Sequence, residues 1–325
     1  MVQLKSAEAM KVGSLFSGIG GIDLGFLQAG FSVSWAVECD HGCCETYRRN
    51  FKDVHLIEND IRRVDPTALP RIDVLSAGFP CQSFSIGGKQ KGFKDYRGNL
   101  FFEVMRFAEA HKPRYIFLEN VANLVEHDKG HTFQVIYKSL VEQGYYVRYR
   151  IMRASEYGNI PQIRDRIYIL AFKNVEDCDR YCFPEPIQLT VSIEEAIDRG
   201  KQKKLLYYYE DNSPFAVRAR SIVTDAQSIY RVYHDSIKPI RNHMCPTLTA
   251  SMGSQKNQVP LVLDNYGVRK LTPFECLRFQ GFPSDFKFPS STMLDDAYKQ
   301  VGNSVCVPVV YRIACNLRKI ENAEI

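Results

Sequence analysis

The sequence of 325 residues lacks several features that would place it in a specialised class of protein. No apolar stretch approaches the roughly 18 residues that suggest a membrane-spanning helix. Residues 1–16 have no long apolar core of the kind found in signal peptides. Internal repeats and low-complexity tracts are also missing. We therefore expect a globular protein that works in the cytoplasm, away from membranes.

The ten cysteines are too sparse for a disulfide framework in a chain of this length. Cys43 and Cys44 are adjacent, which does not suit an ordered set of bridges. Cys178 and Cys182 have C-x3-C spacing, but no second pair with the spacing of a zinc site follows. The pattern predicts a reduced protein without a structural metal.

Charge of one sign is not in large excess either. The formal net charge is +5, and 24% of the residues are charged, while 45% are hydrophobic. This apolar share is enough for a sizeable core, and the length fits one large or two modest domains. The weakly basic balance permits a polyanionic partner but does not require one.

Short apolar runs alternate with amphipathic segments through the first half of the chain. Predicted strands, several of them continuously apolar, cover residues 11–16, 31–38, 54–60, 72–79, 114–121, 145–152 and 166–172. Predicted helices cover residues 20–30, 44–51, 99–111 and 132–144. This alternation is typical of an α/β protein with a doubly wound, mostly parallel sheet.

The pattern changes near Phe183. Residues 183–191 contain two prolines, and the segment that follows is polar, aromatic and irregular as far as about Val268. We interpret this change as the start of a second, smaller domain. The tail, residues 298–320, regains a strand or turn and an amphipathic helix, and its composition fits either domain.

A glycine-rich turn links the first predicted strand to the first predicted helix. Gly18, Gly20 and Gly21 permit a tight turn and the close approach of a ligand to the backbone. Glu38 ends the next strand at the distance from Gly18 at which an acidic residue of this architecture binds ribose hydroxyls. Asp23 stands where the G-x-G-x-x-G pattern has its third glycine. This favours a nucleoside cofactor without phosphates, with an ordinary turn that binds no ligand as the alternative.

Two reactive groups follow predicted strands, and ligands of open α/β sheets bind beyond the carboxyl ends of the strands. Cys81 comes after Pro80, where the chain enters a loop rich in glycine and lysine whose cations favour a thiolate. Glu119 ends an apolar strand, where its carboxyl could have a raised pKa and share a proton. The alternatives are a buried cysteine and a carboxylate bound to nearby backbone.

An arginine pair precedes the last predicted strand of the series. Arg164 and Arg166 lie on the same side of a segment that leads into the sheet. They could join Cys81 and Glu119 at one site. An exposed edge with a salt bridge to Asp165 or Glu156 is the alternative.

These residues belong to six motifs that together resemble the cytosine-5 DNA methyltransferases of bacterial restriction–modification systems. The motifs are FSGIGG (16–21), GFPCQSFS (78–85), ENV (119–121), QIRDR (162–166), RKLTPFECLRFQGFP (269–283) and GNSV (302–305). They occur in the family's order and span almost the whole chain. The sequence departs from the family pattern at Phe274, where arginine is usual, and in YGNIPQ (157–162), which is one residue longer than usual.

The resemblance implies a Rossmann-like methyltransferase that uses S-adenosylmethionine. Cys81 would add to carbon 6 of a flipped-out cytosine, and Glu119 would hold ring nitrogen 3 and the amino group. Arg166, with Arg164 beside it, would contact the 2-oxo group. The cofactor would lie along Phe16, Gly18, Ile19, Gly20, Glu38, Cys39, Asp60, Ile61, Pro80, Leu100, Asn303 and Val305, with Asp60 near the adenine amino group.

The need for Asn303 in the cofactor site favours a tail that returns to the large domain. We therefore assign residues 1–186 and 290–325 to a catalytic domain, and residues 187–289 to a target-recognition domain. Duplex DNA is the implied partner, and a restriction endonuclease would act separately on the same sequence. We expect a monomer, because one asymmetric recognition domain needs no symmetric partner.

Several residues are implied to meet DNA, and the loop 82–99 would close over the flipped base. The implied contacts are Gln82, Ser85, Lys89, Lys91, Arg97, Thr247 and Leu248. Basic and aromatic segments at 201–209 and 217–221 suit phosphate contacts. Candidates for reading base edges are Arg218, Arg220, Arg231 and Arg241.

Three other functions compete with this interpretation. An RNA cytosine methyltransferase of the transfer-RNA type shares the catalytic set, but its usual Cys-Phe-Thr tripeptide is not found after Val121. A catalytically silent DNA-binding regulator would not need the complete set of reactive groups. A nicotinamide or flavin enzyme is disfavoured by the broken glycine spacing.

Overall fold

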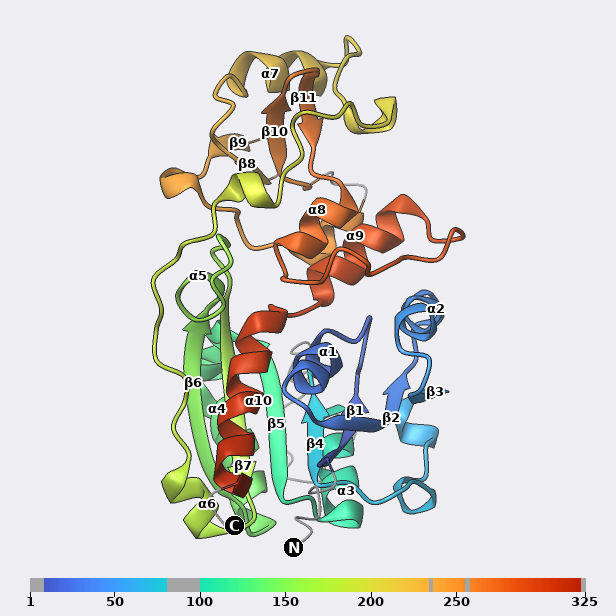
Figure 1. The fold of residues 1–325 in the computed structure, drawn as a ribbon, viewed down its shortest axis with the longest axis vertical. Coiled ribbons are helices and arrows are strands. Elements are labelled where there is room, and N and C mark those ends of the chain that lie inside the picture. Colours follow the sequence, from blue (N-terminus) through green and yellow to red (C-terminus); the bar gives the residue numbers. More distant parts are fainter. Residues whose placement is uncertain (1–8, 81–99, 234–235, 255–257, 323–325) are drawn as a thin grey trace, which may run out of the picture.

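The computed structural model describes residues 9–80, 100–233, 236–254 and 258–322, which form two sheets with a layer of helices between them (Figure 1). The larger sheet has the strand order β3-β2-β1-β4-β5-β7-β6. Its strands are β1 (Lys11–Leu15), β2 (Ser32–Glu38), β3 (His55–Glu58), β4 (Val74–Ala77), β5 (Tyr115–Val121), β6 (Tyr146–Arg153) and β7 (Asp165–Phe172). The predicted α/β fold with a mostly parallel sheet is confirmed.

Strand β7 runs antiparallel to both of its neighbours, whereas the other strand pairs of this sheet are parallel. Val121, the last residue of β5, faces Arg166 near the start of β7. Because β7 is reversed, its first residues lie at the edge where β1, β4 and β5 end. The reversal brings the arginine motif to the carboxyl edge of the sheet.

Helices cover both faces of the larger sheet (Figure 1). The face-covering helices are α1 (Gly21–Gln28) and α10 (Val307–Asn322) on one side, and α3 (Leu100–His111) and α4 (His131–Glu142) on the other. The other α-helices are α2 (His41–Asn50), α5 (Ala154–Tyr157), α6 (Val175–Arg180), α7 (Pro214–Ile222), α8 (Pro273–Arg278) and α9 (Leu294–Asn303). Short 3-10 turns occupy Ile61–Arg63, Pro66–Ala68, Ala122–Val125, His127–Gly130, Ile193–Glu195, Leu205–Tyr207, Arg241–His243 and Ala250–Gly253.

Each face of the sheet has its own hydrophobic core. On one face, Phe26 of α1 and Val310 of α10 are fully buried against strand residues such as Phe117. On the other face, Phe107 of α3 packs against Trp35, with ring centroids 5.9 Å apart. Burial of aromatic and branched side chains on both faces explains why the strands read as continuous apolar runs.

The C-terminal helix α10 packs on the larger sheet instead of extending the small one. Gly25 of α1 gives it room, because a Cβ there would lie 2.7 Å from Val310. Arg312 donates to the carbonyls of Tyr157 and Glu185, each at 2.9 Å. The tail therefore holds the chain at the point where it leaves the larger sheet.

The smaller sheet is antiparallel and lies at the far end of the molecule (Figure 1). Its strands, in the order β11-β10-β8-β9, are β8 (Tyr230–Tyr233), β9 (Ser236–Pro239), β10 (Leu261–Asp264) and β11 (Gly267–Lys270). Helix α7 covers it, and Ala216 and Ala219 are fully buried against Tyr230 and Leu261. This sheet has a hydrophobic core of its own.

Helices α8 and α9 lie between the two sheets (Figure 1). One continuous core joins Tyr298 and Val301 of α9 to Tyr47 and Phe51 at α2. The Thr46 hydroxyl donates to Gln300 Oε1 at 2.8 Å. Helix α2 therefore contacts α9, which lies between the two sheets, through both apolar packing and a hydrogen bond.

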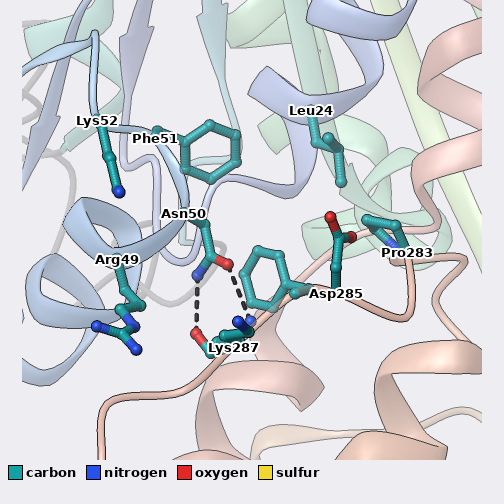
Figure 2. A pocket seen from close by; sticks show the side chains of 9 residues that line it. Leu24, Arg49, Asn50, Phe51, Lys52, Pro283, Asp285 and Lys287 are labelled. Carbon is teal, nitrogen blue, oxygen red and sulfur yellow. Dashed lines mark hydrogen bonds between the residues drawn. The ribbon is translucent and has the colours of Figure 1, made fainter.

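Asn50 adds a second connection between these parts (Figure 2). Its Nδ2 donates to the Lys287 carbonyl at 2.8 Å, and its Oδ1 accepts from the Lys287 N–H at 2.9 Å. Phe51 and Phe286 line the neighbouring cavity of about 430 Å³. The Asn50 amide thus both donates to and accepts from the backbone of Lys287, as the backbone of a neighbouring β-strand would.

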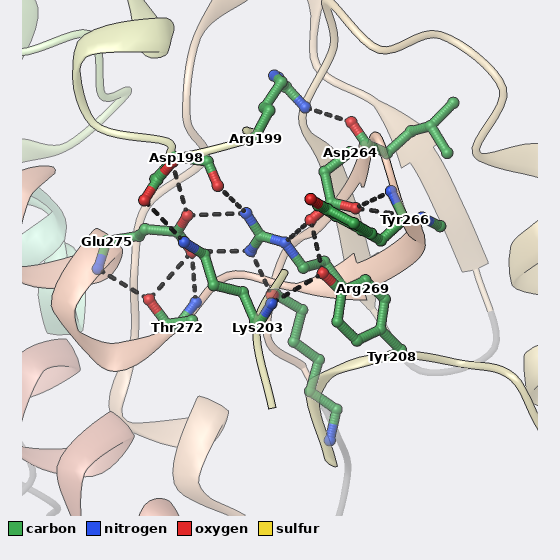
Figure 3. A network of polar contacts seen from close by, with 12 residues as sticks. Asp198, Arg199, Lys203, Tyr208, Asp264, Tyr266, Arg269, Thr272 and Glu275 are labelled. Carbon is green, nitrogen blue, oxygen red and sulfur yellow. Dashed lines mark hydrogen bonds and ion pairs between the residues drawn. The ribbon is translucent and has the colours of Figure 1, made fainter. Parts of the chain in front are cut away.

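Arg269 is the centre of a buried ionic network beside the smaller sheet (Figure 3). Its guanidinium donates to both oxygens of Glu275 at 2.8 Å and, through Nε, to Asp264 at 2.5 Å. The carbonyls of Asp198 and Lys270 accept its other N–H groups. All three ionised side chains have no exposed surface, so each charge depends on the others.

Asp23, which replaces the third glycine, is completely buried between α1 and α2. The Tyr47 hydroxyl donates to its Oδ2 at 2.7 Å. Burial raises the pKa of Asp23 to about 6, although the hydroxyls of Tyr47 and Ser14 offset part of that rise. The bond to Tyr47 fixes a ring that packs against Phe51, at a centroid distance of 4.5 Å, beside the glycine-rich turn.

Replacement of Arg269 by alanine should destabilise the protein by about 3–5 kcal/mol, because two carboxylates would stay buried without their cation. Urea unfolding of R269A and of the wild type measures the difference. R148A is the control, since Arg148 makes only a 3.8 Å pair with the exposed Asp179. That pair should be worth less than about 1 kcal/mol. A loss for R269A as small as that of R148A would contradict the role given to the network.

The buried Asp23 predicts a distinctive pH dependence. The folded state binds the Asp23 proton more tightly than the unfolded chain, so this residue's contribution to stability falls as pH rises from about 4 to about 6. D23N lacks this loss and keeps an acceptor for Tyr47. Its stability relative to the wild type should therefore increase over that range by roughly 3 kcal/mol.

Urea unfolding at several pH values tests this expectation. D179N is the matched control, because Asp179 is largely exposed. D179N removes an exposed carboxylate and no buried one. A D23N difference that changes with pH no more than the D179N difference would show that the Asp23 carboxyl does not carry the shift.

Candidate active site

A cavity of about 590 Å³ opens at the carboxyl edge of the larger sheet. It is bordered by the ends of β1, β2, β4 and β5, by the start of β7 and by the end of α9. The predicted residues that line it are Phe16, Gly18, Ile19, Glu38, Pro80, Glu119, Arg164, Arg166, Asn303 and Val305. Residues from six separate segments thus meet in one place.

The turn after β1 has an unusual backbone conformation. Phe16, Gly18 and Gly20 have positive φ angles of 53°, 54° and 85°. A Cβ on Gly20 would lie 2.2 Å from the Phe51 ring, whereas one on Gly18 would meet nothing within 4 Å. Gly20 is therefore needed for packing against the protein, and Gly18 leaves space on the side of the cavity. Phe16, a non-glycine residue with positive φ, is the kind of strained residue that gathers at ligand sites.

The Glu38 carboxylate accepts hydrogen bonds from the backbone of two segments that border the cavity. Its Oε2 accepts from the Gly18 N–H at 2.8 Å. Its Oε1 accepts from the N–H groups of Cys39 and Asp40, each at 2.8 Å. The carboxylate holds the glycine-rich turn against the start of α2 and still lines the cavity. A carboxylate can accept several hydrogen bonds, so Glu38 can also bind hydroxyl groups of a ligand.

Glu119 and Arg166 form an ion pair at the floor of the cavity. Arg166 Nε lies 3.0 Å from Glu119 Oε1, and both side chains are nearly buried. Burial raises the pKa of Glu119, and the positive charges of Arg166 and Arg164 offset part of that rise. A carboxyl in this condition can change its protonation state when a ligand alters its surroundings.

Arg164 is 2% exposed, and its N–H groups are directed to the backbone of other segments. Nη1 donates to the Leu248 carbonyl at 2.6 Å, and Nη2 donates to the carbonyls of Ser304 and Gly302. Burial and the neighbouring Arg166 lower the pKa of Arg164. The structure thus makes Arg164 a support for the cavity wall, whereas Arg166 pairs directly with Glu119.

Some predicted cofactor residues do not line the cavity: Gly20, Cys39, Asp60, Ile61 and Leu100. Asp60 Oδ1 accepts from the Arg62 N–H at 3.0 Å, and the same carboxylate pairs with the Arg62 side chain. This pairing lowers the pKa of Asp60 to about 2. Contact of these residues with a cofactor stays a prediction.

Thr247 and Leu248, which were predicted to meet DNA, make contacts inside the protein. Leu248 has no exposed surface, and its N–H is bonded to Gln162 Oε1 at 3.2 Å. The Thr247 hydroxyl donates to the Ile163 carbonyl. These residues attach the segment around 248 to the arginine motif. Contact of either residue with DNA stays a prediction. The pattern alone did not distinguish such an internal contact from an external one.

The remaining predicted site residues fall into two groups, those outside the described part of the chain and those inside it. Cys81, Gln82, Ser85, Lys89, Lys91 and Arg97 lie outside the described residues. Arg220, a candidate for reading bases, donates to the carbonyls of Tyr209 and Asp211 and so supports α7. Arg231 lies over the Tyr233 ring, 5.3 Å from its centroid.

The two departures from the family pattern have local explanations. Asn159, within the longer YGNIPQ segment, adopts a left-handed conformation with φ 52°. Its Oδ1 accepts from the Thr190 N–H at 2.8 Å, so the added residue ties the segment to the connection between the sheets. Phe274 is half exposed and packs its ring against Phe288, with centroids 5.5 Å apart.

Sequence reasoning missed several residues that line the cavity: Ile22, Asp40, Cys43, Asn120, Ala250, Gln300 and Ser304. Asn120 and Gln300 are both nearly buried; Asn120 lies inside the ENV motif, and Gln300 lies two residues before the GNSV motif. A polar residue next to a known reactive group was the available signal. Their contacts depend on segments distant in sequence, so the signal could not give their roles.

Two kinds of feature are absent from the described residues. In the described part of the chain, no group of three or more His, Cys, Asp or Glu side chains could hold a metal ion. The same residues include no helix long and apolar enough to cross a membrane.

Solved structures share the fold. A mutant of DNMT2 from Spodoptera frugiperda has a TM-score of 0.72 at 19% identity, covering 95% of this chain and 100% of that one. A putative DNA modification methyltransferase encoded in an E. coli prophage has a TM-score of 0.69 at 22% identity, covering 97% and 100%. At this level of identity the likeness establishes the architecture alone.

Relatives in sequence are closer. Type II methyltransferase M.Bsp6I from Bacillus sp. (strain RFL6) is 47% identical over 313 residues, which cover 95% of this chain and 99% of the relative. Type II methyltransferase M.HhaI from Haemophilus parahaemolyticus is 34% identical and covers 98% and 97%. The family of C-5 cytosine-specific DNA methylases matches residues 10–319. The chain therefore belongs to this family of restriction–modification methyltransferases and is a DNA (cytosine-5) methyltransferase.

Proposed function

We propose that this enzyme transfers a methyl group from S-adenosylmethionine to carbon 5 of a cytosine flipped out of duplex DNA, through a covalent bond between Cys81 and carbon 6. The observation that carries the proposal is the shared cavity. It combines a turn suited to a nucleoside with the buried Glu119–Arg166 pair, directly beside Pro80. Both reactants of a methyl transfer would meet there.

Carbon 5 of cytosine is a poor nucleophile, so the ring must first be activated. Addition of the Cys81 thiolate to carbon 6 would place electron density on carbon 5. Carbon 5 would then bond to the methyl group while the bond from that group to the cofactor's sulfur breaks and its electron pair goes to the sulfur. A base would remove the carbon-5 proton, the electron pair of that bond would reform the 5,6 double bond, and the thiolate would leave. Cys81 lies outside the described residues, but Pro80, the residue before it, lines the cavity.

Glu119 suits recognition of the cytosine ring. Its raised pKa favours a carboxyl that shares a proton with ring nitrogen 3 while it accepts from the amino group. Arg166, already 3.0 Å from Glu119, would stabilise the carboxylate form and donate to the 2-oxo group. Arg164 would act indirectly, because its N–H groups are bound to backbone carbonyls.

The other side of the cavity fits a nucleoside cofactor. Gly18 leaves open space beside the turn, and the Glu38 carboxylate can accept from ribose hydroxyls. Asn303 and Val305 border the same space from the end of α9. S-adenosylmethionine, when bound, supplies an activated methyl group. The residues of the turn would orient it toward the position of the cytosine ring.

A cytosine inside a duplex cannot reach a buried Glu119, so the base must be rotated out of the stack. We propose residues 1–186 and 290–325 as the catalytic domain, and residues 187–289 as the domain that recognises the DNA sequence. The separate core of the smaller sheet supports this division. We further propose a monomer, with a restriction endonuclease as a separate protein that cuts the same sequence.

Covalent trapping tests the proposed nucleophile. The wild type should form a stable adduct with duplex DNA that contains 5-fluorocytosine, because fluorine at carbon 5 cannot leave as a proton does. C81S should form none. DNA from cells that express the enzyme, read by bisulfite sequencing, gives the target sequence and supplies the trapping substrate. Methylation of transfer RNA without any of DNA would refute the DNA substrate, and an adduct in C81S would refute the nucleophile.

The role of Glu38 can be tested by cofactor binding. E38Q keeps one acceptor but loses the charge that would hold ribose hydroxyls, and it should weaken S-adenosylmethionine binding by roughly 10- to 100-fold. E58Q is the matched control, because Glu58 faces Glu38 in the neighbouring strand and lies outside the cavity. Calorimetry measures both affinities, and equal affinity for E38Q and wild type would contradict this cofactor position.

A further inference from the structure

Asn120 connects the two strand ends that carry the proposed chemistry. It is 4% exposed, and its Nδ2 donates to the Phe79 carbonyl at 2.9 Å. Its Oδ1 accepts from the Val121 N–H at 2.9 Å, which fixes the orientation of the amide. Asn120 follows Glu119 in the chain, and Phe79 precedes Pro80. One buried side chain therefore joins the end of β5 to the segment that leads to Cys81.

The bond to Phe79 lies where the regular pairing of these strands has ended. The β4–β5 ladder stops at Ala77 and Leu118, so Phe79 corresponds in register to Asn120. Beyond Ala77 the chain must leave the sheet, and Pro80 has no N–H that could continue a ladder. The Asn120 amide supplies a donor at this position. Packing of the Phe79 ring against Phe101, at a centroid distance of 5.6 Å, holds the same residue from the other side.

This arrangement restricts the Phe79–Pro80 peptide. A carbonyl that accepts a buried hydrogen bond cannot rotate freely, and the proline ring fixes its own φ angle near −65°. The position from which residue 81 extends is thereby defined relative to β5. Glu119, the neighbour of Asn120 in β5, is defined by the same strand.

We propose that Asn120 is a positioning residue that sets the distance between the Cys81 thiol and the cytosine ring held by Glu119. The inference rests on the proposed function. Asn120 lines the shared cavity, but its amide is already bonded to the Phe79 carbonyl and the Val121 N–H, so it acts through the Phe79–Pro80 peptide. A misplacement of reacting groups by about 1 Å can slow a reaction about 100-fold, which makes one hydrogen bond at this position important for the rate.

The test compares adduct formation on 5-fluorocytosine duplex DNA with saturating DNA and S-adenosylmethionine. N120A should trap DNA about 100-fold more slowly than the wild type. Its affinity for S-adenosylmethionine should stay within about threefold, because neither hydrogen bond of the Asn120 amide involves the glycine-rich turn or Glu38. A reduced trapping rate together with an unchanged cofactor affinity is the result expected of a positioning residue.

Q143A is the control for simple loss of a hydrogen-bonded amide that is partly buried. Gln143 Nε2 donates to the Met105 carbonyl at 3.0 Å, which ties the end of α4 to α3 away from the cavity. It should lower the unfolding midpoint about as much as N120A and leave the trapping rate unchanged. N120A with a much lower midpoint and weakened cofactor binding would indicate a general folding role and overturn the inference.

N120D separates the hydrogen bond from the volume of the side chain. An ionised carboxylate cannot donate to the Phe79 carbonyl, whereas its protonated form can. N120D should therefore trap slowly at pH 8 and recover relative to the wild type as the pH falls. An adduct formed by N120A at the wild-type rate but absent in C81S would refute the inference alone. An adduct that persists in C81S would refute the proposed function, and the inference with it.

Discussion

The cavity depends on a single buried cation, Arg164. Its guanidinium is bonded to the carbonyls of Leu248, Gly302 and Ser304, which belong to segments far apart in the chain. A buried charge without acceptors would be very costly, so the three segments must stay in place around it. They are the segment between β9 and β10 that holds Leu248, the end of α9 with Gly302 and Ser304, and the segment before β7 that carries Arg164 itself. The wall of the site is thus held by electrostatics as well as by apolar packing.

The need to compensate buried charge also explains why Glu119 lies beside the two arginines. Arg166 comes two residues after Arg164 in the motif. Its Nε is 3.0 Å from Glu119 Oε1, and its Nη1 donates to the carbonyl of the preceding Asp165. Two adjacent arginines repel each other, and Glu119 offsets that repulsion. Burial raises the pKa of Glu119, and the charges of the two arginines offset part of that rise. A ligand that competes for Arg166 would therefore change the protonation of Glu119, which suits a carboxyl that must handle a proton on cytosine.

Much of the architecture followed from the order of apolar runs and glycines. The strands and helices of the larger sheet were expected near their observed positions, because burial on both faces leaves continuous apolar runs. The reactive residues at strand ends followed from the rule that such sheets bind ligands there. The antiparallel direction of β7 was not predictable, because an apolar run such as 166–172 reads the same in either direction. That reversal is what places Arg166 opposite Val121, close to Glu119.

The different roles of similar side chains also depend on the tertiary structure. The sequence by itself determined the residue types and their order: a glycine turn, a proline–cysteine pair, a glutamate at a strand end and two arginines. The tertiary structure assigned Arg164 to the backbone and Arg166 to Glu119, and it buried Leu248, which a motif had suggested for DNA contact. It also gave Asn120 its bond to Phe79. Local sequence sets which groups are available, but hydrogen-bond partners and burial depend on segments that meet only when the chain is folded.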